Sequence, residues 1–217
     1  MTIQLKKWTN KFGREYTDRN PATPEALDRL YKVRLGVTRT ALNNIFLGRM
    51  DRSIKILEIG SNTGMQLALL QRMGFKNLYG IEPQDYAVKT CKARTRNIHL
   101  IEGNVFELPF SNGHFDLVFT SGVLIHINPK DIERAMREIH RCSSRYIWGY
   151  EYYSKQYKEI TYKGEKNLLW KADFTRLYLE LFSDLQLIEE KRLTYLESNK
   201  IDTMFLLKKS IKNEAKK

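Results

Sequence analysis

Residues 54–64 read Ile-Lys-Ile-Leu-Glu-Ile-Gly-Ser-Asn-Thr-Gly, a short apolar run that ends in a loop with glycines at positions 60 and 64. The apolar run has the length of a buried strand, and the glycines allow the chain to turn into a following helix. A unit of this kind is typical of α/β proteins, in which such loops lie beside a bound cofactor.

The loop does not match the patterns that bind phosphate groups. A dinucleotide site needs the pattern G-x-G-x-x-G, but counting from Gly60 the second and third glycines are replaced by Asn62 and Met65. A Walker loop ends in Gly-Lys-Ser/Thr, whereas Gly64 is followed by Met65 and Gln66. S-adenosylmethionine has no phosphate and needs only a close backbone approach, so we predict it as the cofactor. The residues predicted to hold it here are Glu58, near its ammonium group, with Gly60, Ser61, Asn62 and Gly64.

A second strand over 78–82 also ends in a carboxylate. Glu82 follows Gly60 by 22 residues, close to the offset of about 20 residues at which a strand-end acid meets ribose hydroxyls in dinucleotide folds. A carboxylate at this place accepts both hydroxyl protons, so we expect Glu82 and the adjacent Pro83 to contact the nucleoside.

Strands and helices alternate through the middle of the chain. Strands are predicted near 54–59, 77–82, 98–101, 115–120 and 145–150, with helices near 64–73, 84–95 and 129–141, the last opened by Asn128 and Pro129. This alternation predicts a Rossmann-like, doubly wound α/β fold with a mostly parallel sheet. After residue 182 the alternation stops, and the runs 185–196 and 202–209 predict a closing antiparallel hairpin.

We expect three regions: a helical leader over 1–50, a cofactor-binding domain over 51–210 and a basic tail over 211–217. Helical spacing is clear in the leader from Pro24 onward. Its segment 8–21 is rich in aromatic and arginine side chains, so we predict that it folds over the cofactor. Tyr16 would then cover the sulfonium, and Arg19 would face a carboxylate.

The composition limits which cellular compartment and which binding partners we expect for the protein. The 217 residues suit one α/β domain with additions. Cys91 and Cys142 lack redox or metal-ligand spacing, so we expect inert thiols in a reducing compartment and no metal site. With no apolar run of about 20 residues and no apolar signal core, we expect a cytoplasmic protein without a membrane partner. The formal charge of +12 attracts anions, nucleic acid among them, although no RNA-binding signature accompanies it.

Polar side chains follow the later strands, where ligands of such sheets bind. Asn104 and Val105 follow the third strand, and we expect them to read adenine through a side-chain oxygen and a backbone N–H. Ser121 and Gly122 begin the loop after the fourth strand, beside the expected sulfonium. The same loop carries His126, which would remove a proton from the nucleophile at an unperturbed pKa near 6.5, or else serve a structural role under the loop.

Glu151 and Tyr152 follow the fifth strand. Glu151 would orient or deprotonate the nucleophile, and Tyr152 would bind the acceptor or shield the cationic methyl group; packing at a strand end is the alternative for the tyrosine.

Several segments resemble the class I methyltransferases of the pseudaminic-acid-biosynthesis-associated methylase family. They are Phe-Gly-Arg-Glu-Tyr-Thr-Asp-Arg-Asn over 12–20, the loop 57–64, Ser-Gly-Val-Leu-Ile-His-Ile-Asn-Pro over 121–129, and the shorter segments 145–147, 151–153, 162–164 and 171–174. The resemblance implies S-adenosylmethionine at the residues named above, and a substrate side built from the leader, the His126 loop and the Glu151 segment. Ala172 and Met204 depart from the family's usual arginine and tryptophan, on the substrate side.

We therefore predict a methyltransferase that acts on oxygen or nitrogen of a small polar molecule, with a nonulosonic-acid sugar or its nucleotide-linked precursor favoured. An RNA methyltransferase acting on tRNA is the alternative that the charge motivates. A protein that binds S-adenosylmethionine without catalysis is the second alternative, and no oligomeric state follows from the sequence.

Overall fold

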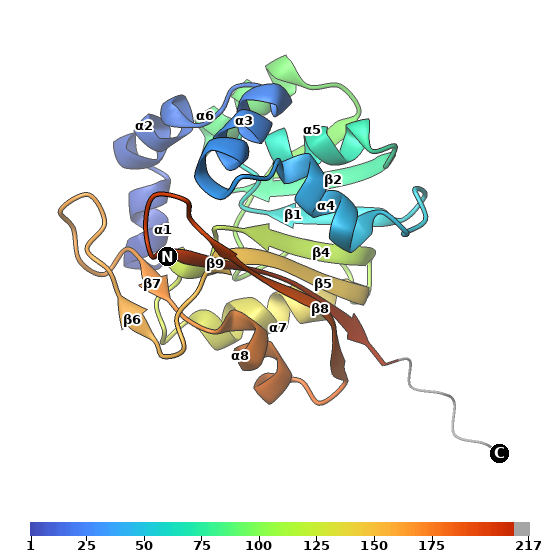
Figure 1. Ribbon diagram of the computed structural model, residues 1–217. Coiled ribbons are helices and arrows are strands. Elements are labelled where there is room, and N and C mark those ends of the chain that lie inside the picture. The colour runs from blue at the N-terminus through green and yellow to red at the C-terminus, as the bar shows by residue number, and fades with distance from the viewer. Residues whose placement is uncertain (211–217) are drawn as a thin grey trace.

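A seven-stranded sheet runs through the middle of the computed structural model, which describes residues 1–210 (Figure 1). The strand order is β3-β2-β1-β4-β5-β9-β8. The strands are β1 (Lys55–Ile59), β2 (Asn77–Glu82), β3 (Ile98–Glu102), β4 (Phe115–Ser121), β5 (Ser143–Tyr152), β8 (Leu185–Thr194) and β9 (Ile201–Lys209). Strands β1 to β5 pair in parallel, whereas β9 pairs antiparallel with both β5 and β8. The predicted doubly wound sheet with its closing hairpin is confirmed.

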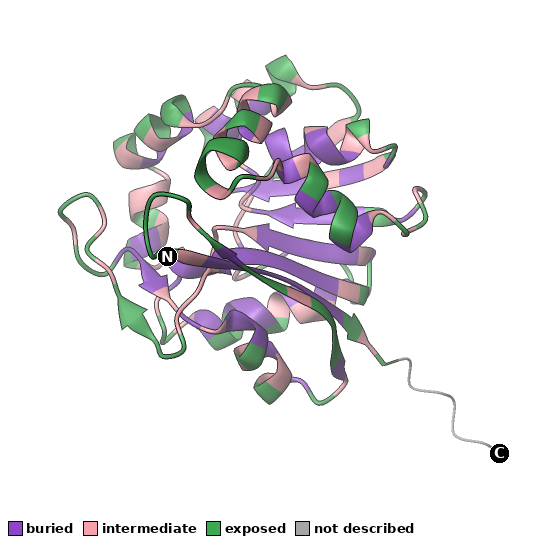
Figure 2. Cartoon of the chain, in the orientation of Figure 1, coloured by how far each residue is buried: buried purple, intermediate pink, exposed green. Residues whose placement is uncertain are grey.

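Helices cover both faces of this sheet. They are α1 (Ile3–Trp8), α2 (Lys11–Arg19), α3 (Pro24–Leu35), α4 (Arg39–Leu47), α5 (Met65–Arg72), α6 (Asp85–Arg94), the short 3₁₀ turn η1 (Leu124–His126), α7 (Ile132–Cys142) and α8 (Phe174–Leu181). One large apolar cluster joins α4, α5 and α6 to the sheet, a second joins α7 and α8 to its opposite face, and a small third cluster joins α3 to α5. Figure 2 shows the result, with the central strands of the sheet buried between helices whose outer surfaces are exposed.

The predicted start of the helix over 129–141 was wrong. Asn128 does not cap that helix: its side chain accepts a hydrogen bond from the Lys130 N–H at 3.0 Å, and its carbonyl accepts from the Asp131 N–H. These bonds form a tight turn, and α7 begins only at Ile132. The small hairpin of β6 (Lys158–Glu159) and β7 (Trp170–Lys171) and the helix α8 were not predicted.

The leader forms four helices. Pro24 occupies the first turn of α3, which ends at Gly36 in a left-handed conformation with φ of 73°. Because Leu42 and Phe46 of α4 are buried in the core, α4 is part of the cover of the sheet. Helices α1 and α2 lie over the carboxyl ends of the parallel strands (Figure 1).

The predicted tail over 211–217 lies outside the described residues. Within residues 1–210, no helix has the length and apolar character needed to cross a membrane. The same part of the chain contains no group of three or more histidine, cysteine or acidic side chains that could hold a metal ion.

Candidate functional site

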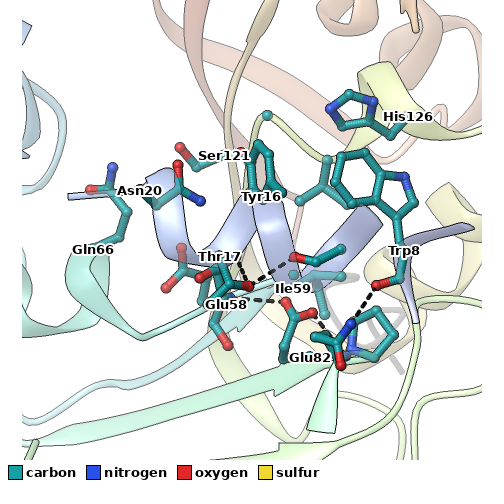
Figure 3. A pocket seen from close by; sticks show the side chains of 18 of the residues that line it. Trp8, Tyr16, Thr17, Asn20, Glu58, Ile59, Gln66, Glu82, Ser121 and His126 are labelled. Carbon is teal, nitrogen blue, oxygen red and sulfur yellow. Dashed lines mark hydrogen bonds between the residues drawn. The ribbon is translucent and has the colours of Figure 1, made fainter. Parts of the chain in front are cut away.

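A cavity of about 280 Å³ lies at the carboxyl ends of the parallel strands, beneath the leader helices (Figure 3). Most of the predicted site residues line it. They are Tyr16, Glu58, Gly60, Ser61, Asn62, Glu82, Pro83, Asn104, Val105, Ser121, Gly122, His126 and Tyr152. The predicted residues that lie outside this lining are Arg19, Gly64 and Glu151. The structure thus brings together the ends of β1, β2, β4 and β5, the residues after β3, and the leader.

The glycine loop is held against the end of β2. Gly60 has a φ of 66°, and a Cβ at this position would lie 2.6 Å from a methyl group of Val123, so a larger residue does not fit. The backbone N–H groups of Gly60 and Ser61 donate to the Ile81 carbonyl at 2.8 and 3.2 Å. The backbone of the loop therefore comes close to whatever occupies the cavity.

Gly64 has a different task from the one predicted. Its φ is 74°, it caps the start of α5, and a Cβ there would lie 2.6 Å from the Cys91 sulfur of α6. The glycine permits close packing of α5 against α6 and lies outside the cavity lining, so its contact with the cofactor stays a prediction.

The Glu82 carboxylate is fixed by two backbone groups. Its oxygens accept hydrogen bonds from the N–H groups of Asn62 and Gln84, both at 2.9 Å. Burial raises the pKa of Glu82 to about 7, although both backbone bonds favour the ionised form. Each carboxylate oxygen keeps a further lone pair, as ribose hydroxyls would require.

Three buried oxygen atoms of the cavity lining have no hydrogen-bond partner among residues 1–210: Glu58 Oε2, Ser61 Oγ and Gln66 Oε1. Unpaired buried acceptors are costly, which indicates that a ligand with donor groups completes them. Burial raises the pKa of Glu58 well above its usual range, opposed by the charge of Arg39. A cationic ammonium group would favour the ionised carboxylate, so the residues present fit the amino-acid end of S-adenosylmethionine.

The side-chain oxygen of Asn104, which we predicted to contact adenine, is already bonded within its own turn. The Asn104 side-chain oxygen accepts a hydrogen bond from the Phe106 N–H at 3.0 Å. Val105 and Phe106 also line the cavity, and an apolar wall there suits a planar base. The adenine assignment of Asn104 and Val105 stays a prediction.

His126 is not the unperturbed histidine that the sequence suggested. Its Nδ1 donates to the Leu168 carbonyl at 2.7 Å, since a carbonyl can only accept, and its ring lies 4.5 Å from that of Trp8 (Figure 3). Burial lowers the pKa of His126 to about 4, and the Leu168 bond opposes this change only in part. The imidazole is therefore neutral at physiological pH, with its Nε2 lone pair free to accept a proton or a hydrogen bond.

Glu151, which we predicted to contact the nucleophile, does not line the cavity. Strand β5 continues to Tyr152, and because side chains alternate along a strand, Tyr150 and Tyr152 line the cavity while Glu151 faces away. Glu151 is fully buried and accepts from the N–H groups of Val123 at 3.1 Å and Ile125 at 3.3 Å. The carboxyl group thus holds the 121–126 loop from behind.

Tyr16 and Arg19, the two leader residues predicted to bind the cofactor, lie in different surroundings. Tyr16 lines the cavity with its ring 5.1 Å from Trp8, and burial raises the pKa of its phenol to about 12. Arg19, the last residue of α2, is exposed and lies outside the cavity lining, and its contact with a cofactor carboxylate stays a prediction.

Arg39 of α4 was missed by the sequence analysis. It is fully buried, and its guanidinium donates to Asn43 Oδ1 at 2.8 Å, to the Tyr31 hydroxyl at 2.8 Å and to Ser121 Oγ at 3.3 Å. Tyr31 and Ser121 both line the cavity. A signal was available: Arg39 and Asn43 fall in the same helical stripe as the core residues 42 and 46, where a charged side chain must have a partner.

The strand order and the glycine loop after β1 are typical of class I, S-adenosylmethionine-dependent methyltransferases. Residues 57–145 match the family model of the methyltransferase domain. The chain thus carries the catalytic domain of such an enzyme, with S-adenosylmethionine as its methyl donor.

Solved structures share this fold. The PH0226 protein of Pyrococcus horikoshii OT3 is 16% identical with a TM-score of 0.66, covering 90% of this chain and 99% of that chain. A 1,6-didemethyltoxoflavin-N1-methyltransferase of Burkholderia thailandensis, solved with 1,6-didemethyltoxoflavin and S-adenosylhomocysteine, is 15% identical with a TM-score of 0.65, covering 92% and 83%. A putative methyltransferase in complex with the Haloferax volcanii Trm112 methyltransferase activator is 13% identical with a TM-score of 0.66, covering 94% and 97%. None of the curated proteins searched matches the chain.

Proposed function

We propose that the protein is a cytoplasmic enzyme that methylates an oxygen or nitrogen atom of a small polar molecule. The favoured acceptor is a nonulosonic-acid sugar or its nucleotide-linked precursor. The cytoplasmic placement rests on Cys91 and Cys142, which are both buried as free thiols. The sugar rests on the resemblance of the leader, the His126 loop and the later segments to the pseudaminic-acid-associated methylases.

The enclosure of the cavity carries the proposal of a small acceptor. In the leader, Gln4 donates to the Asn167 carbonyl at 3.1 Å, and Lys7 forms an ion pair with Glu165. We propose that residues 1–50 act in this way as a lid over the domain of residues 51–210. A lid whose first helix is tied to the segment between β6 and β7 admits a small molecule more readily than a base within a folded polymer.

The cavity-lining residues divide between two tasks. S-adenosylmethionine supplies an electrophilic methyl group, and Glu58 and Glu82 would hold its two polar ends. His126 Nε2 would accept a hydrogen bond, and then the proton, from an attacking hydroxyl or amine. Its low pKa keeps it unprotonated but makes it a weak base, so much of the rate enhancement would come from alignment in a site with little water.

The Burkholderia structure supports a small acceptor, because that enzyme was solved with both 1,6-didemethyltoxoflavin and S-adenosylhomocysteine bound. A small molecule can therefore occupy this fold beside the cofactor.

Purified protein incubated with S-adenosylmethionine and a panel of sugars tests the proposal through S-adenosylhomocysteine formation. We expect turnover on at least one nonulosonic acid or nucleotide sugar. Glu82→Ala should abolish cofactor binding, whereas Glu102→Ala, at the neighbouring and exposed strand end of β3, should leave it unchanged. Absence of product with every sugar, alongside turnover on tRNA, would overturn the acceptor assignment.

RNA methylation is the second candidate because the chain carries a formal charge of +12. It predicts tRNA binding that weakens steeply with salt, since phosphate contacts release counterions. A filter-binding titration between low and physiological salt distinguishes the two, and absent or salt-independent retention of tRNA removes this candidate. Cofactor binding without product on either class of acceptor would instead favour a non-catalytic protein.

A further inference from the structure

Among the tyrosines that line the cavity are Tyr31 of α3, Tyr150 of β5 and Tyr195, which directly follows β8. We call these three residues the tyrosine wall. The rings of Tyr31 and Tyr150 lie 5.3 Å apart. Their hydroxyl groups are not independent, because each is bound to a buried charged residue outside the cavity lining.

Asp202 of β9 fixes two of the three hydroxyls. It is 1% exposed, and its Oδ2 atom accepts hydrogen bonds from the Tyr150 hydroxyl and, at 3.0 Å, from the Tyr195 hydroxyl. A phenol has one proton to donate. Because both protons are directed to Asp202, the oxygens of Tyr150 and Tyr195 can only accept further bonds. Burial raises the pKa of both phenols, so they keep these protons at neutral pH.

Arg39 fixes the third hydroxyl in the opposite sense. Its guanidinium donates to the Tyr31 oxygen at 2.8 Å, and a guanidinium has no lone pair with which to accept. The Tyr31 proton is therefore free to be donated to a ligand. The same guanidinium lies 4.6 Å from the centre of the Tyr150 ring, so the wall is one connected unit from α4 to β9.

We infer that the tyrosine wall binds hydroxyl groups of the methyl acceptor. Asp202 and Arg39 act as positioning residues: they leave the Tyr31 hydroxyl as a donor to the ligand and the Tyr150 and Tyr195 oxygens as acceptors. A hydroxyl group both donates and accepts, so adjacent hydroxyls match this pattern. A planar heterocycle with acceptor atoms alone would leave Tyr150 and Tyr195 unmatched, at the cost of buried polar groups without partners. The inference rests on the proposed function and narrows its acceptor to a polyhydroxylated molecule.

Binding of candidate acceptors in the presence of S-adenosylhomocysteine tests the tyrosine wall without requiring methyl transfer. The probes are N-acetylneuraminic acid, UDP-N-acetylglucosamine and pyrazine, a planar heterocycle with acceptor atoms alone, and the binding of each is followed by saturation-transfer NMR and calorimetry. We expect at least one sugar to bind. Tyr195→Phe and Asp202→Asn should weaken it about tenfold or more, as expected for loss of a hydrogen bond worth roughly 1.4 kcal/mol. In turnover assays the same variants should raise the acceptor KM and leave kcat within about twofold.

Two controls separate recognition from folding. Tyr146 belongs to the same strand as Tyr150 but lies outside the cavity lining. Tyr146→Phe should therefore change neither the sugar Kd nor the acceptor KM. The S-adenosylhomocysteine Kd should be unchanged in Tyr195→Phe, which a general loss of structure would not permit.

Sugar binding that Tyr195→Phe and Asp202→Asn leave intact would overturn the inference. So would binding of pyrazine with no binding of either sugar, even if methyl transfer is then observed. Sugar binding that depends on the wall but yields no S-adenosylhomocysteine from S-adenosylmethionine would support the inference and overturn the proposed function instead.

Discussion

Replacing Glu151 with glutamine should flatten the dependence of stability on pH. Burial raises the pKa of Glu151 from its ordinary value of 4.5 to about 7, even though backbone N–H bonds from the 121–126 loop favour the ionised form. The folded state therefore binds this proton more tightly than the unfolded state. Its contribution to stability is complete below pH 4.5, declines as the pH rises, and levels off above about pH 7.

The size of the effect follows from the two pKa values. Complete ionisation costs the fold about 3.4 kcal/mol for a rise from 4.5 to about 7. About 0.8 kcal/mol of this is already lost at pH 5, so roughly 2.5 kcal/mol should be lost between pH 5 and pH 8. Glutamine removes that dependence. It also leaves one of the two loop N–H groups without its acceptor, a cost of about 1 to 3 kcal/mol that does not vary with pH.

Urea unfolding of the cofactor-free protein, followed by tryptophan fluorescence at several pH values between 5 and 8, measures the difference. The wild-type free energy of unfolding should fall more steeply than that of Glu151→Gln, by about 2.5 kcal/mol over this range. Glu102→Gln, at an exposed position, should follow the wild type. Curves for Glu151→Gln and wild type that stay parallel within about 0.5 kcal/mol would refute the reasoning.

Three further outcomes are expected. Gly60→Ala should destabilise the fold by about 1 to 3 kcal/mol, because φ is 66° and the new methyl group would meet Val123; an unchanged Tm would contradict this. Arg39→Met should weaken S-adenosylmethionine binding in calorimetry, because the Glu58 carboxylate loses the positive charge that favours its ionised form; an equal Kd would count against that link. With a pKa near 4, His126 should produce no inflection in the rate of methyl transfer around pH 6.5, and an inflection there that His126→Gln removes would show the assignment to be mistaken.

The cofactor half of the fold was predictable because its signals are local. An apolar run, a glycine loop and a strand-end acid follow one another within a few residues, so β1 and β2 were placed within one residue of their observed ends. Parallel pairing then brings Glu58 and Glu82 to the same edge of the sheet without knowledge of any side-chain contact.

The substrate side depended on information that is not local. Glu151 was expected at the cavity because β5 was thought to end at residue 150, and two more residues of strand reverse the side on which it lies. The bonds of Asp202 to Tyr150 and Tyr195 require the antiparallel register of β5, β9 and β8, which no short motif encodes. The low pKa of His126 likewise follows from its enclosure in the packed structure.

The contacts of α1 have a consequence for the order in which the molecule is made. Gln4 bonds to a residue 163 positions later, and Lys7 to one 158 positions later. During synthesis these leader residues leave the ribosome long before their partners exist, so α1 cannot close over the cavity until residues 165 and 167 have been made. This helix is thus placed later than the strands β1 to β5, although it precedes them in the sequence. A nascent chain stalled before residue 165 would carry the strand-end carboxylates Glu58 and Glu82 without a closed chamber around them.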